Sequence, residues 1–403
     1  MAESGLRLTP LQRTILGIAV RAGPLSRAEL ARRAASSRSR LSPEIAQLLA
    51  DGVLVEAGHD VSSGGRPGAL LRPGGADVAV LAGADIDSDR AAVTVTTLDG
   101  TVIARDELSL RANADPRRTL ERTASMLEGC LPEECGPLLA VGLSVPGDID
   151  PAGAAIESAP TLPRWVGVRL ADLFAARMGV RTFVDNDVNV LAVAEAAHPR
   201  DLQRLGASFL VVKISSGIGC GIVVDGTVFR GSHGFAGDIG HIAADPTDPT
   251  RCACGNRGCL EALAAAPAIL RAAGATTLDK VGEAARSGDP EVAALLRTVG
   301  SHLGLVLAGL VSFFNPEAVI VRSGIPGGEE LLLNAVRQRI YERALPTSTH
   351  ALQVLPSRFG EDAGALGAAI LAGQGYLGLA GAVAQARPVR RALDLAAVAA
   401  PGR

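Results

Sequence analysis

The sequence has little that would place the chain in or across a membrane. Its first ten residues, MAESGLRLTP, lack the apolar stretch of a secretory signal peptide. The most apolar later stretch, from Leu303 to Phe314, is too short to span a bilayer and is followed by Asn-Pro-Glu. We therefore expect that stretch to form a buried helix. We also expect no membrane partner and a cytoplasmic chain, in which cysteines stay reduced.

The chain also lacks a strong excess of charge of one sign, because its net charge is only −3. The charges are unevenly distributed, however. Residues 1–75 contain ten arginines and six acidic residues, a net charge of +4, and residues 76–403 therefore carry −7. A hydrophobic content of 48% in 403 residues excludes a largely disordered chain. The sequence thus predicts a basic module at 1–75 joined to a larger acidic one at 76–403.

The basic module has the pattern of three helices followed by two short extended segments. Apolar residues recur at helical spacing over residues 9–21. Ser26 can cap a second helix with Glu29 as its capping-box partner, and a third helix with an apolar face ends near Gly52. Pro43 is compatible with a start of this third helix slightly after Arg38. The order of elements predicts a winged helix-turn-helix.

In a winged helix-turn-helix the third helix enters the major groove of DNA. We therefore expect contacts with double-stranded operator DNA near the start of that helix, and a further contact in the wing, from Ser37, Arg38, Ser39, Arg40 and Arg66. The residues alone leave an alternative open. A three-helix module with a solvated arginine face could bind another protein instead.

The larger module contains two copies of one strand pattern. Strand, turn, strand, Asp-Gly and strand follow one another from Val78 and again from Phe209, with the sequence DGTV in both copies. This predicts a duplicated α/β fold with halves at about 76–200 and 201–375, a C-terminal segment at 376–403, and a ligand in the cleft between the halves. Coincidence is the alternative, because Asp-Gly turns are frequent.

The two copies differ in the composition of their first turn. The second copy has SSGIGCG at 215–221, where small residues let backbone N–H groups approach an anion. The first copy has DIDSDR at 85–90, with three carboxylates and no glycine. A phosphate would be repelled there. The glycine-rich loop is weak evidence by itself, because hairpin turns also need glycine.

Three of the six cysteines and one histidine fall in a single stretch, Gly240–Glu261. Four such ligands can close a tetrahedral Zn²⁺ site and leave no position for a reacting water, so we expect a structural zinc held by His241, Cys252, Cys254 and Cys259. The alternative is three unrelated buried thiols and a surface histidine. The carboxylates of Asp238 and Glu261 flank this stretch and would be held near one place by the metal.

Asn186 and Asp187 follow an extended run and open a helix. Polar side chains at this position of an α/β fold commonly contact ligands, and amide and carboxylate groups suit the hydroxyls of a polyol. Helix capping is the alternative for these two residues alone.

The stretch Gly240–Glu261 resembles the signature of the ROK family, which comprises sugar-responsive repressors and sugar kinases. Other stretches agree with that family in the same order: SVPGDID at 144–150, APTLPRW at 159–165, VDNDVN at 184–189, GDIGH at 237–241 and FNPEAVIV at 314–321. The winged helix with its GGRP sequence is similar to that of the repressor branch, and the kinases lack it. The resemblance covers nearly the whole chain and implies an actin-like, ribonuclease H-like body with two lobes.

The resemblance also implies roles for individual residues. His241, Cys252, Cys254 and Cys259 match the family's zinc ligands. Its sugar-hydroxyl contacts match Asn186, Asp187, His241 and Glu261, with Asp187 in the place of the kinase base. Asp238 stands where the family usually has Glu, so it keeps the charge with one methylene less of reach.

Two further stretches depart from the family's kinases. Where those enzymes have approximately DIGGTK, this chain has DIDSDR, and VRSGIPGG at 321–328 departs from a run of glycines. Both departures argue against ATP as a cofactor and against an enzyme.

We therefore expect a transcriptional regulator, in the form of a repressor whose homodimer or homotetramer binds operator DNA and responds to a sugar or sugar phosphate. The alternative is an ATP-dependent, glucokinase-like sugar kinase that retains a DNA-binding module, supported by Asp187 and the glycine-rich loop. A third hypothesis is a constitutive repressor with a vestigial cleft.

Overall fold

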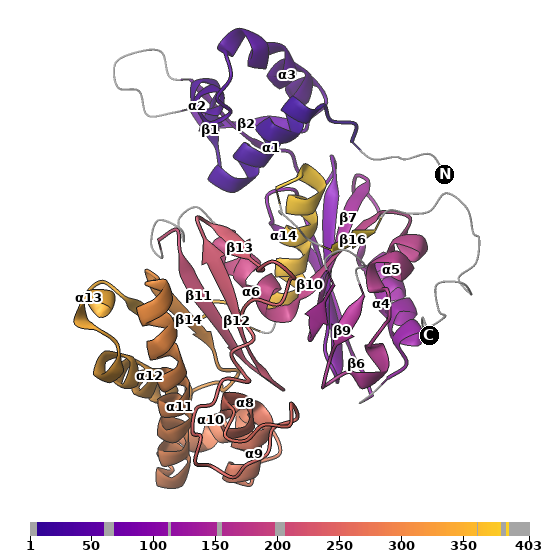
Figure 1. Cartoon of the computed structure of the whole chain (residues 1–403). Coiled ribbons are helices and arrows are strands. Elements are labelled where there is room, and N and C mark those ends of the chain that lie inside the picture. The colour runs from indigo at the N-terminus through magenta and orange to yellow at the C-terminus, as the bar shows by residue number, and fades with distance from the viewer. Residues whose placement is uncertain are drawn as a thin grey trace. The chain divides into compact units, whose positions relative to one another are not determined.

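The chain divides by its internal contacts into unit 1, Met1–Arg200 with Glu361–Arg403, and unit 2, Asp201–Gly360. Figure 1 shows the helices and strands of both units along the chain. The computed structural model describes residues 6–59, 68–111, 114–150, 155–197, 206–360, 362–379 and 384–386. Each unit contains one large mixed sheet with helices, so the expected α/β class is confirmed.

Residues 6–59 and 68–73 form a small module of helices and short strands within unit 1, which we call the head. Its sheet has the order β1-β3-β2 with antiparallel pairs, and Ile15, Leu30 and Ile45 are among its fully buried side chains. Its elements are α1 (Pro10–Ala22), β1 (Leu25–Ser26), α2 (Arg27–Arg33), α3 (Arg38–Ala50), β2 (Leu54–His59) and β3 (Ala69–Pro73).

Two details of the head differ from the sequence predictions. Ser26 caps α2 by accepting a hydrogen bond from the Glu29 backbone N–H at 3.3 Å. The Glu29 carboxylate does not complete a capping box, because it binds the guanidinium groups of Arg32 and Arg33 in charge-assisted hydrogen bonds. The expected start of α3 after Arg38 is also wrong: Ser37 caps a helix that begins at Arg38 and includes Pro43.

The large sheets of the two units have the same strand order. In unit 1, five strands run β6-β5-β4-β7-β10, and in unit 2 the order is β13-β12-β11-β14-β15. In each sheet the first three strands pair antiparallel and the last three pair parallel. The predicted duplication is confirmed by this shared topology. A sixth strand, β16 (Ala384–Ala386), lies antiparallel to β10 in unit 1.

The remaining elements of unit 1 are β4 (Val80–Ile86), β5 (Arg90–Thr96), β6 (Val102–Ser109), α4 (Pro116–Cys130), β7 (Leu138–Val145), β8 (Asp148–Ile149), β9 (Ile156–Ser158), the short 3₁₀ helix η1 (Pro163–Trp165), α5 (Leu170–Met178), β10 (Arg181–Asn186), α6 (Asp187–Ala196) and α14 (Ala363–Leu377). Those of unit 2 are β11 (Phe209–Ile214), β12 (Ile218–Val224), β13 (Thr227–Phe229), α8 (Leu260–Ala264), α9 (Ala266–Ala273), α10 (Leu278–Arg286), α11 (Pro290–Phe314), β14 (Ala318–Arg322), α12 (Glu329–Arg343), α13 (Pro346–Thr349) and β15 (Gln353–Pro356).

Helix α14 packs closely on the sheet of unit 1. Gly83 of β4 and Gly142 of β7 are paired across the two strands, and both face this helix. A Cβ atom at Gly83 would lie 2.0 Å from the Ala365 carbonyl oxygen, and one at Gly142 would lie 1.9 Å from that of Ala368. Only glycine permits such an approach of backbone to backbone. The alternate residues of both strands belong to a core that α4 and α5 cover.

Helix α11 contains the apolar stretch that the sequence analysis placed in a core. By length and composition it could cross a membrane, and half of its most apolar window is buried. Leu303, Leu307 and Val311 are fully buried in the core of unit 2, so the expected buried helix is confirmed. Phe313 near its end is 89% exposed. The helix ends at Asn315, which adopts a left-handed conformation with φ 51°.

The substitution Gly142→Ala tests the contact between α14 and the sheet. We expect it to lower the free energy of unfolding by about 1–3 kcal/mol, because backbone must move to accommodate the methyl group. Gly129→Ala in α4 is the matched control, since a Cβ there meets open space. It should raise the free energy of unfolding by about 0.4–1 kcal/mol. Urea unfolding of both variants measures this, and equal effects would contradict the proposed packing constraint.

Candidate metal centre and ligand-contact residues

The structure brings His241, Cys252, Cys254 and Cys259 together in unit 2. Their ligand atoms all lie within 4.8 Å of one another. The Cys252 Sγ lies 3.4 Å from His241 Nδ1, and the Cys254 Sγ lies 3.7 Å from the Cys259 Sγ. All three cysteines are free thiols. Cys252 and Cys259 are buried, whereas Cys254 is exposed.

These distances fit a tetrahedral metal. With Zn–S and Zn–N bonds of about 2.3 and 2.0–2.1 Å, two sulfurs would be separated by about 3.8 Å and a sulfur and a nitrogen by about 3.6 Å. The observed separations of 3.7 and 3.4 Å are close to these values. Burial raises the pKa of the Cys259 thiol to about 12 in the absence of a metal. A cation bound beside Cys259 would favour its thiolate form.

Backbone hydrogen bonds shape the loop that carries the ligands. The Cys252 N–H donates to the Asn256 carbonyl at 2.9 Å, and the Gly255 N–H donates to the Cys252 carbonyl at 3.0 Å. Gly258 has φ 65°, and a Cβ atom there would lie 1.8 Å from the Asp245 carbonyl oxygen. These bonds form a tight turn in which Cys252 and Cys254 precede Cys259 by only a few residues.

Two of the predicted sugar-contact residues lie beside this loop. The Glu261 N–H donates to the Gly240 carbonyl at 2.8 Å, next to His241 in the sequence. The Glu261 carboxylate accepts a hydrogen bond from the Ile218 N–H at 3.4 Å. It also lies over Gly217, where a Cβ atom would be 2.6 Å from a carboxylate oxygen. Asp238, which precedes Gly240 in the sequence, is exposed. The metal ligands, Glu261 and the glycine-rich loop therefore form one local arrangement in unit 2.

Asn186 and Asp187 lie in unit 1, where β10 ends and α6 begins. The Asn186 side chain accepts from the Val188 N–H at 3.0 Å and donates to the Gly147 carbonyl at 2.7 Å. It therefore caps α6 and fixes the turn after β7, so the capping role considered for this residue is observed. The Asp187 carboxylate also accepts from the Val188 N–H at 3.0 Å.

The first-copy turn has partners that were not expected from the sequence. The buried Asp85 carboxylate accepts a hydrogen bond from Ser144 at 2.5 Å and lies 3.8 Å from the Arg90 guanidinium. Arg90 also pairs with Glu107 at 3.2 Å. A Cβ atom at Gly364 of α14 would lie 2.3 Å from an Asp85 carboxylate oxygen. The sequence held one signal for these contacts: Arg90 ends DIDSDR and so places a cation in the same turn as Asp85.

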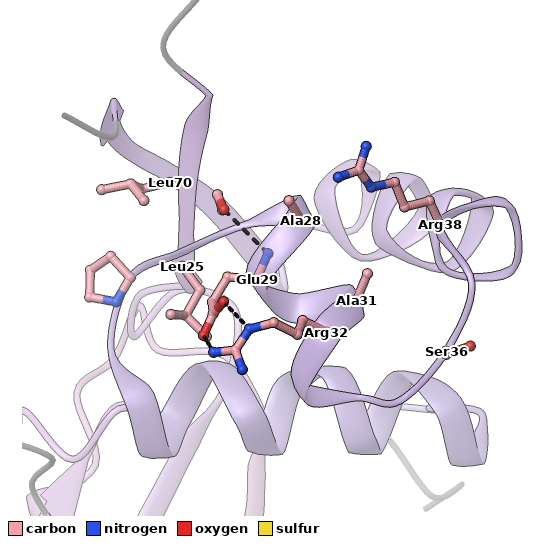
Figure 2. Close-up of a pocket in the computed structure, with 10 residues that line it drawn as sticks. Leu25, Ala28, Glu29, Ala31, Arg32, Ser36, Arg38 and Leu70 are labelled. Atoms are coloured by element: carbon pink, nitrogen blue, oxygen red, sulfur yellow. Dashed lines mark hydrogen bonds and ion pairs between the residues drawn. The ribbon is translucent and has the colours of Figure 1, made fainter. Parts of the chain in front are cut away.

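The predicted DNA contacts lie at the start of α3 in the head. Arg38 and Arg40 are exposed, and the Ser37 hydroxyl accepts from the Arg40 N–H at 3.4 Å while lying 3.1 Å from the Ser39 hydroxyl. Figure 2 shows Arg38 at a concavity of about 700 Å³ beside α2, which Glu29, Arg32 and Leu70 also line. The predicted wing contact, Arg66, lies outside the described residues.

Comparison with known proteins identifies the family. Residues 81–375 match the family model described as ROK family. The chain belongs to the ROK family. The resemblance on the metal loop and the other stretches is thereby confirmed. Residues 1–80, which include the head, precede the matched region.

Relatives of both branches are similar to this ROK protein. The xylose repressor of Bacillus spizizenii is 29% identical over 367 residues, which cover 88% of this chain and 93% of that protein. The glucokinase of Thermotoga maritima is 31% identical over 316 residues, which cover 72% of this chain and 96% of that protein. A ROK-family transcriptional regulator homologous to the Escherichia coli MLC protein has a crystal structure that matches with a TM-score of 0.77 and 24% identity, covering 92% of this chain and 96% of that one.

These matches confirm the actin-like, two-lobed fold class of the ROK body. The matches also differ in how much of each chain they cover. The match to the glucokinase covers nearly all of that enzyme but leaves more than a quarter of this chain unmatched. The repressor match extends over most of both chains.

Metal content tests the cluster directly. We expect purified protein to contain about one tightly held divalent metal per chain by mass spectrometry, and Cys254→Ser to lose most of it, because a hydroxyl is a poor fourth ligand. The variant should unfold at a temperature lower by about 4–8 °C, as a loss of about 2 kcal/mol implies. Cys135→Ser, outside the cluster, is the control and should change neither value. Unchanged metal content in Cys254→Ser would exclude this residue as a ligand.

Proposed function

We propose that this ROK protein is a cytoplasmic, sugar-responsive transcriptional repressor. Its homo-oligomer binds operator DNA through the head, which acts as a winged helix-turn-helix, and a zinc ion has a structural role in unit 2. A sugar or sugar phosphate is contacted by Asn186, Asp187, Asp238, His241 and Glu261.

The head is the observation that carries this proposal. It contributes three helices and a three-stranded sheet ahead of the region that matches the family model. At the N-terminal end of α3, Arg38 and Arg40 are exposed, where guanidinium groups can reach bases or phosphates. The similarity to a xylose repressor over 88% of the chain supports the same function.

The proposed sugar contacts have groups suited to hydroxyls. The Nδ1 atom of His241 faces Cys252, so a metal bound there leaves Nε2 as a donor. Glu261 supplies a carboxylate beside the metal loop, and its position is fixed by backbone bonds to Gly240 and Ile218. Zinc would hold His241 and Glu261 at a constant separation without taking part in chemistry, because four protein ligands fill its coordination shell.

The first-copy turn supports a non-enzymatic function. Asp85 is held by Ser144 and Arg90, and Asp87 and Asp89 add two further carboxylates. These carboxylates would repel the phosphates of a nucleoside triphosphate. The turn also has no glycine that would let the phosphates approach its backbone N–H groups. The alternative, an ATP-dependent sugar kinase, is favoured by the 31% identity to a glucokinase and by Asp187 in the position of the family's base.

Helix α14 offers a route from the sugar-contact residues to the head. Along α14, Gly367 lies against Val190 of α6, the helix that Asn186 caps. At its C-terminal end, Leu379 lies over Gly17 of α1, and its carbonyl accepts from Arg21 at 2.9 Å. The Tyr376 hydroxyl donates to the Leu6 carbonyl at 2.7 Å. A ligand that moved α6 would therefore displace a helix in contact with the DNA-binding module.

The substitution Arg40→Ala tests DNA recognition by α3. We expect it to weaken binding to an operator selected from a random duplex library by about 1–3 kcal/mol, with a smaller loss on non-operator DNA, because a base contact is lost. Fluorescence anisotropy measures both affinities. Arg297→Ala in unit 2 is the control and should leave them unchanged. An equal loss on every sequence would make Arg40 a phosphate contact, and no loss would remove α3 from the interface.

A sugar panel tests the effector and separates the repressor from the kinase. We expect one aldose or its phosphate to raise the unfolding temperature and to weaken operator binding at least tenfold, without consuming ATP. Glu261→Gln should lose most of this response because the amide replaces a carboxylate acceptor. Glu283→Gln on α10 is the control. Sugar phosphorylation with ATP would establish the kinase instead, and no response to any sugar would favour the constitutive repressor.

A further inference from the structure

A cavity of about 550 Å³ lies at the start of α4 in unit 1, apart from the sugar-contact residues and from the head. It is lined by Arg111, Ala114, Asp115, Arg118, Thr119 and Arg122. We call it the arginine pocket. Its size is within the range of small-molecule sites. Three guanidinium groups against one carboxylate give its lining a net positive charge.

The single carboxylate of the pocket is engaged with other groups. Asp115 caps α4 by accepting from the Arg118 backbone N–H at 3.0 Å, and it pairs with Arg164 at 3.4 Å. The neighbouring wall is held in place as well, because the buried Trp165 indole donates to the Ala114 carbonyl at 3.3 Å. The positions of Ala114 and Asp115 are therefore fixed by contacts that leave the guanidinium groups of the three pocket arginines uninvolved.

The arginines of the pocket differ from Arg164 and Arg177 in their carboxylate partners. Arg177 binds both Glu121 and Glu128 of α4, and Arg164 binds Asp115. Within the described part of the chain, the guanidinium groups of Arg111, Arg118 and Arg122 have no carboxylate partner.

The three unpartnered groups are also gathered in one place. Arg118 and Arg122 are four residues apart on one helix, a spacing at which like charges destabilise the helix. Arg111, on the loop after β6, adds a third positive charge. An anion in the pocket would offset the repulsion among the three groups.

We propose that the arginine pocket binds a small phosphate-bearing anion, either inorganic phosphate or a phosphate monoester. Planar guanidinium groups bind the oxygens of such an anion in pairs, and several of them together match a dianion. The N-terminal end of α4 adds a favourable dipole. The pocket is partly open, and its volume of about 550 Å³ suits a small ligand, whereas a nucleic acid backbone needs an extended surface. The site would give the protein a second ligand in addition to its sugar.

Calorimetric titration of the full-length, metal-loaded protein with inorganic phosphate tests the proposal, with chloride used to keep ionic strength constant. We expect saturable binding, and a loss of affinity of at least tenfold in Arg118→Gln/Arg122→Gln. Arg271→Gln, an exposed arginine of α9 in unit 2, is the matched control and should bind as the parent does. A titration with glycerol phosphate, with glycerol as its control, then distinguishes the two ligands. A site for a phosphate monoester binds glycerol phosphate more tightly than inorganic phosphate.

Three outcomes would overturn the proposal. The parent protein could show no saturable binding at millimolar phosphate, or the double variant could bind phosphate with unchanged affinity. In the third outcome, the double variant would lose affinity for non-operator duplex DNA and keep its affinity for phosphate. The last would make the pocket a nucleic-acid contact. If the double variant fails to fold by circular dichroism, Arg111→Gln on the loop supplies the same test, because this residue lies outside the helix.

Discussion

The contact between α14 and the paired glycines of β4 and β7 is the constraint on which unit 1 depends. The helix backbone lies so close to Gly83 and Gly142 that neither position has room for a Cβ atom. Because α14 lies at this distance, it also reaches α6, which begins with the proposed sugar contacts, and Asp85 in the first-copy turn. Its C-terminal end reaches α1 of the head. The position of one helix thus links the sheet, the proposed sugar contacts and the head.

The duplicated topology places different chemistry at equivalent turns. In unit 2, Gly217 leaves space that the Glu261 carboxylate occupies, and the turn remains free of charged side chains of its own. In unit 1, the corresponding turn carries Asp85, Asp87 and Asp89, with Asp85 bound to Ser144 and Arg90. The same strand order therefore supports a turn that receives one carboxylate from a distant residue in unit 2 and a turn with three carboxylates of its own in unit 1.

Local features of this chain were predictable from sequence. Short extended runs are joined by tight turns at Asp99-Gly100 and Asp225-Gly226, so short-range patterns were sufficient for β4–β6 and β11–β13. The metal cluster was predictable for the same reason, because one loop carries all four ligands.

Contacts between distant parts of the sequence were not predictable in this way. Helix α14 lies on strands about 220 to 280 residues earlier in the chain, and its alanines and glycines have no one-sided apolar stripe that would indicate a partner. The bond from Ser144 to Asp85 depends on the pairing of β4 with β7. The capping box at Ser26 failed because the nearby arginines compete for Glu29. The cleft between the halves remains a prediction.

The division of the chain into units has a consequence for the order in which the protein can form during synthesis. Unit 2 is a continuous segment, whereas unit 1 needs α14 from beyond residue 360. The sheet that emerges first from the ribosome therefore has one glycine-lined face uncovered until nearly the whole chain has been made. Unit 2 can complete its core earlier, although its residues follow those of the first sheet. The head gains its contact with α14 only at the last stage, so a chain truncated before α14 would carry a head without that contact.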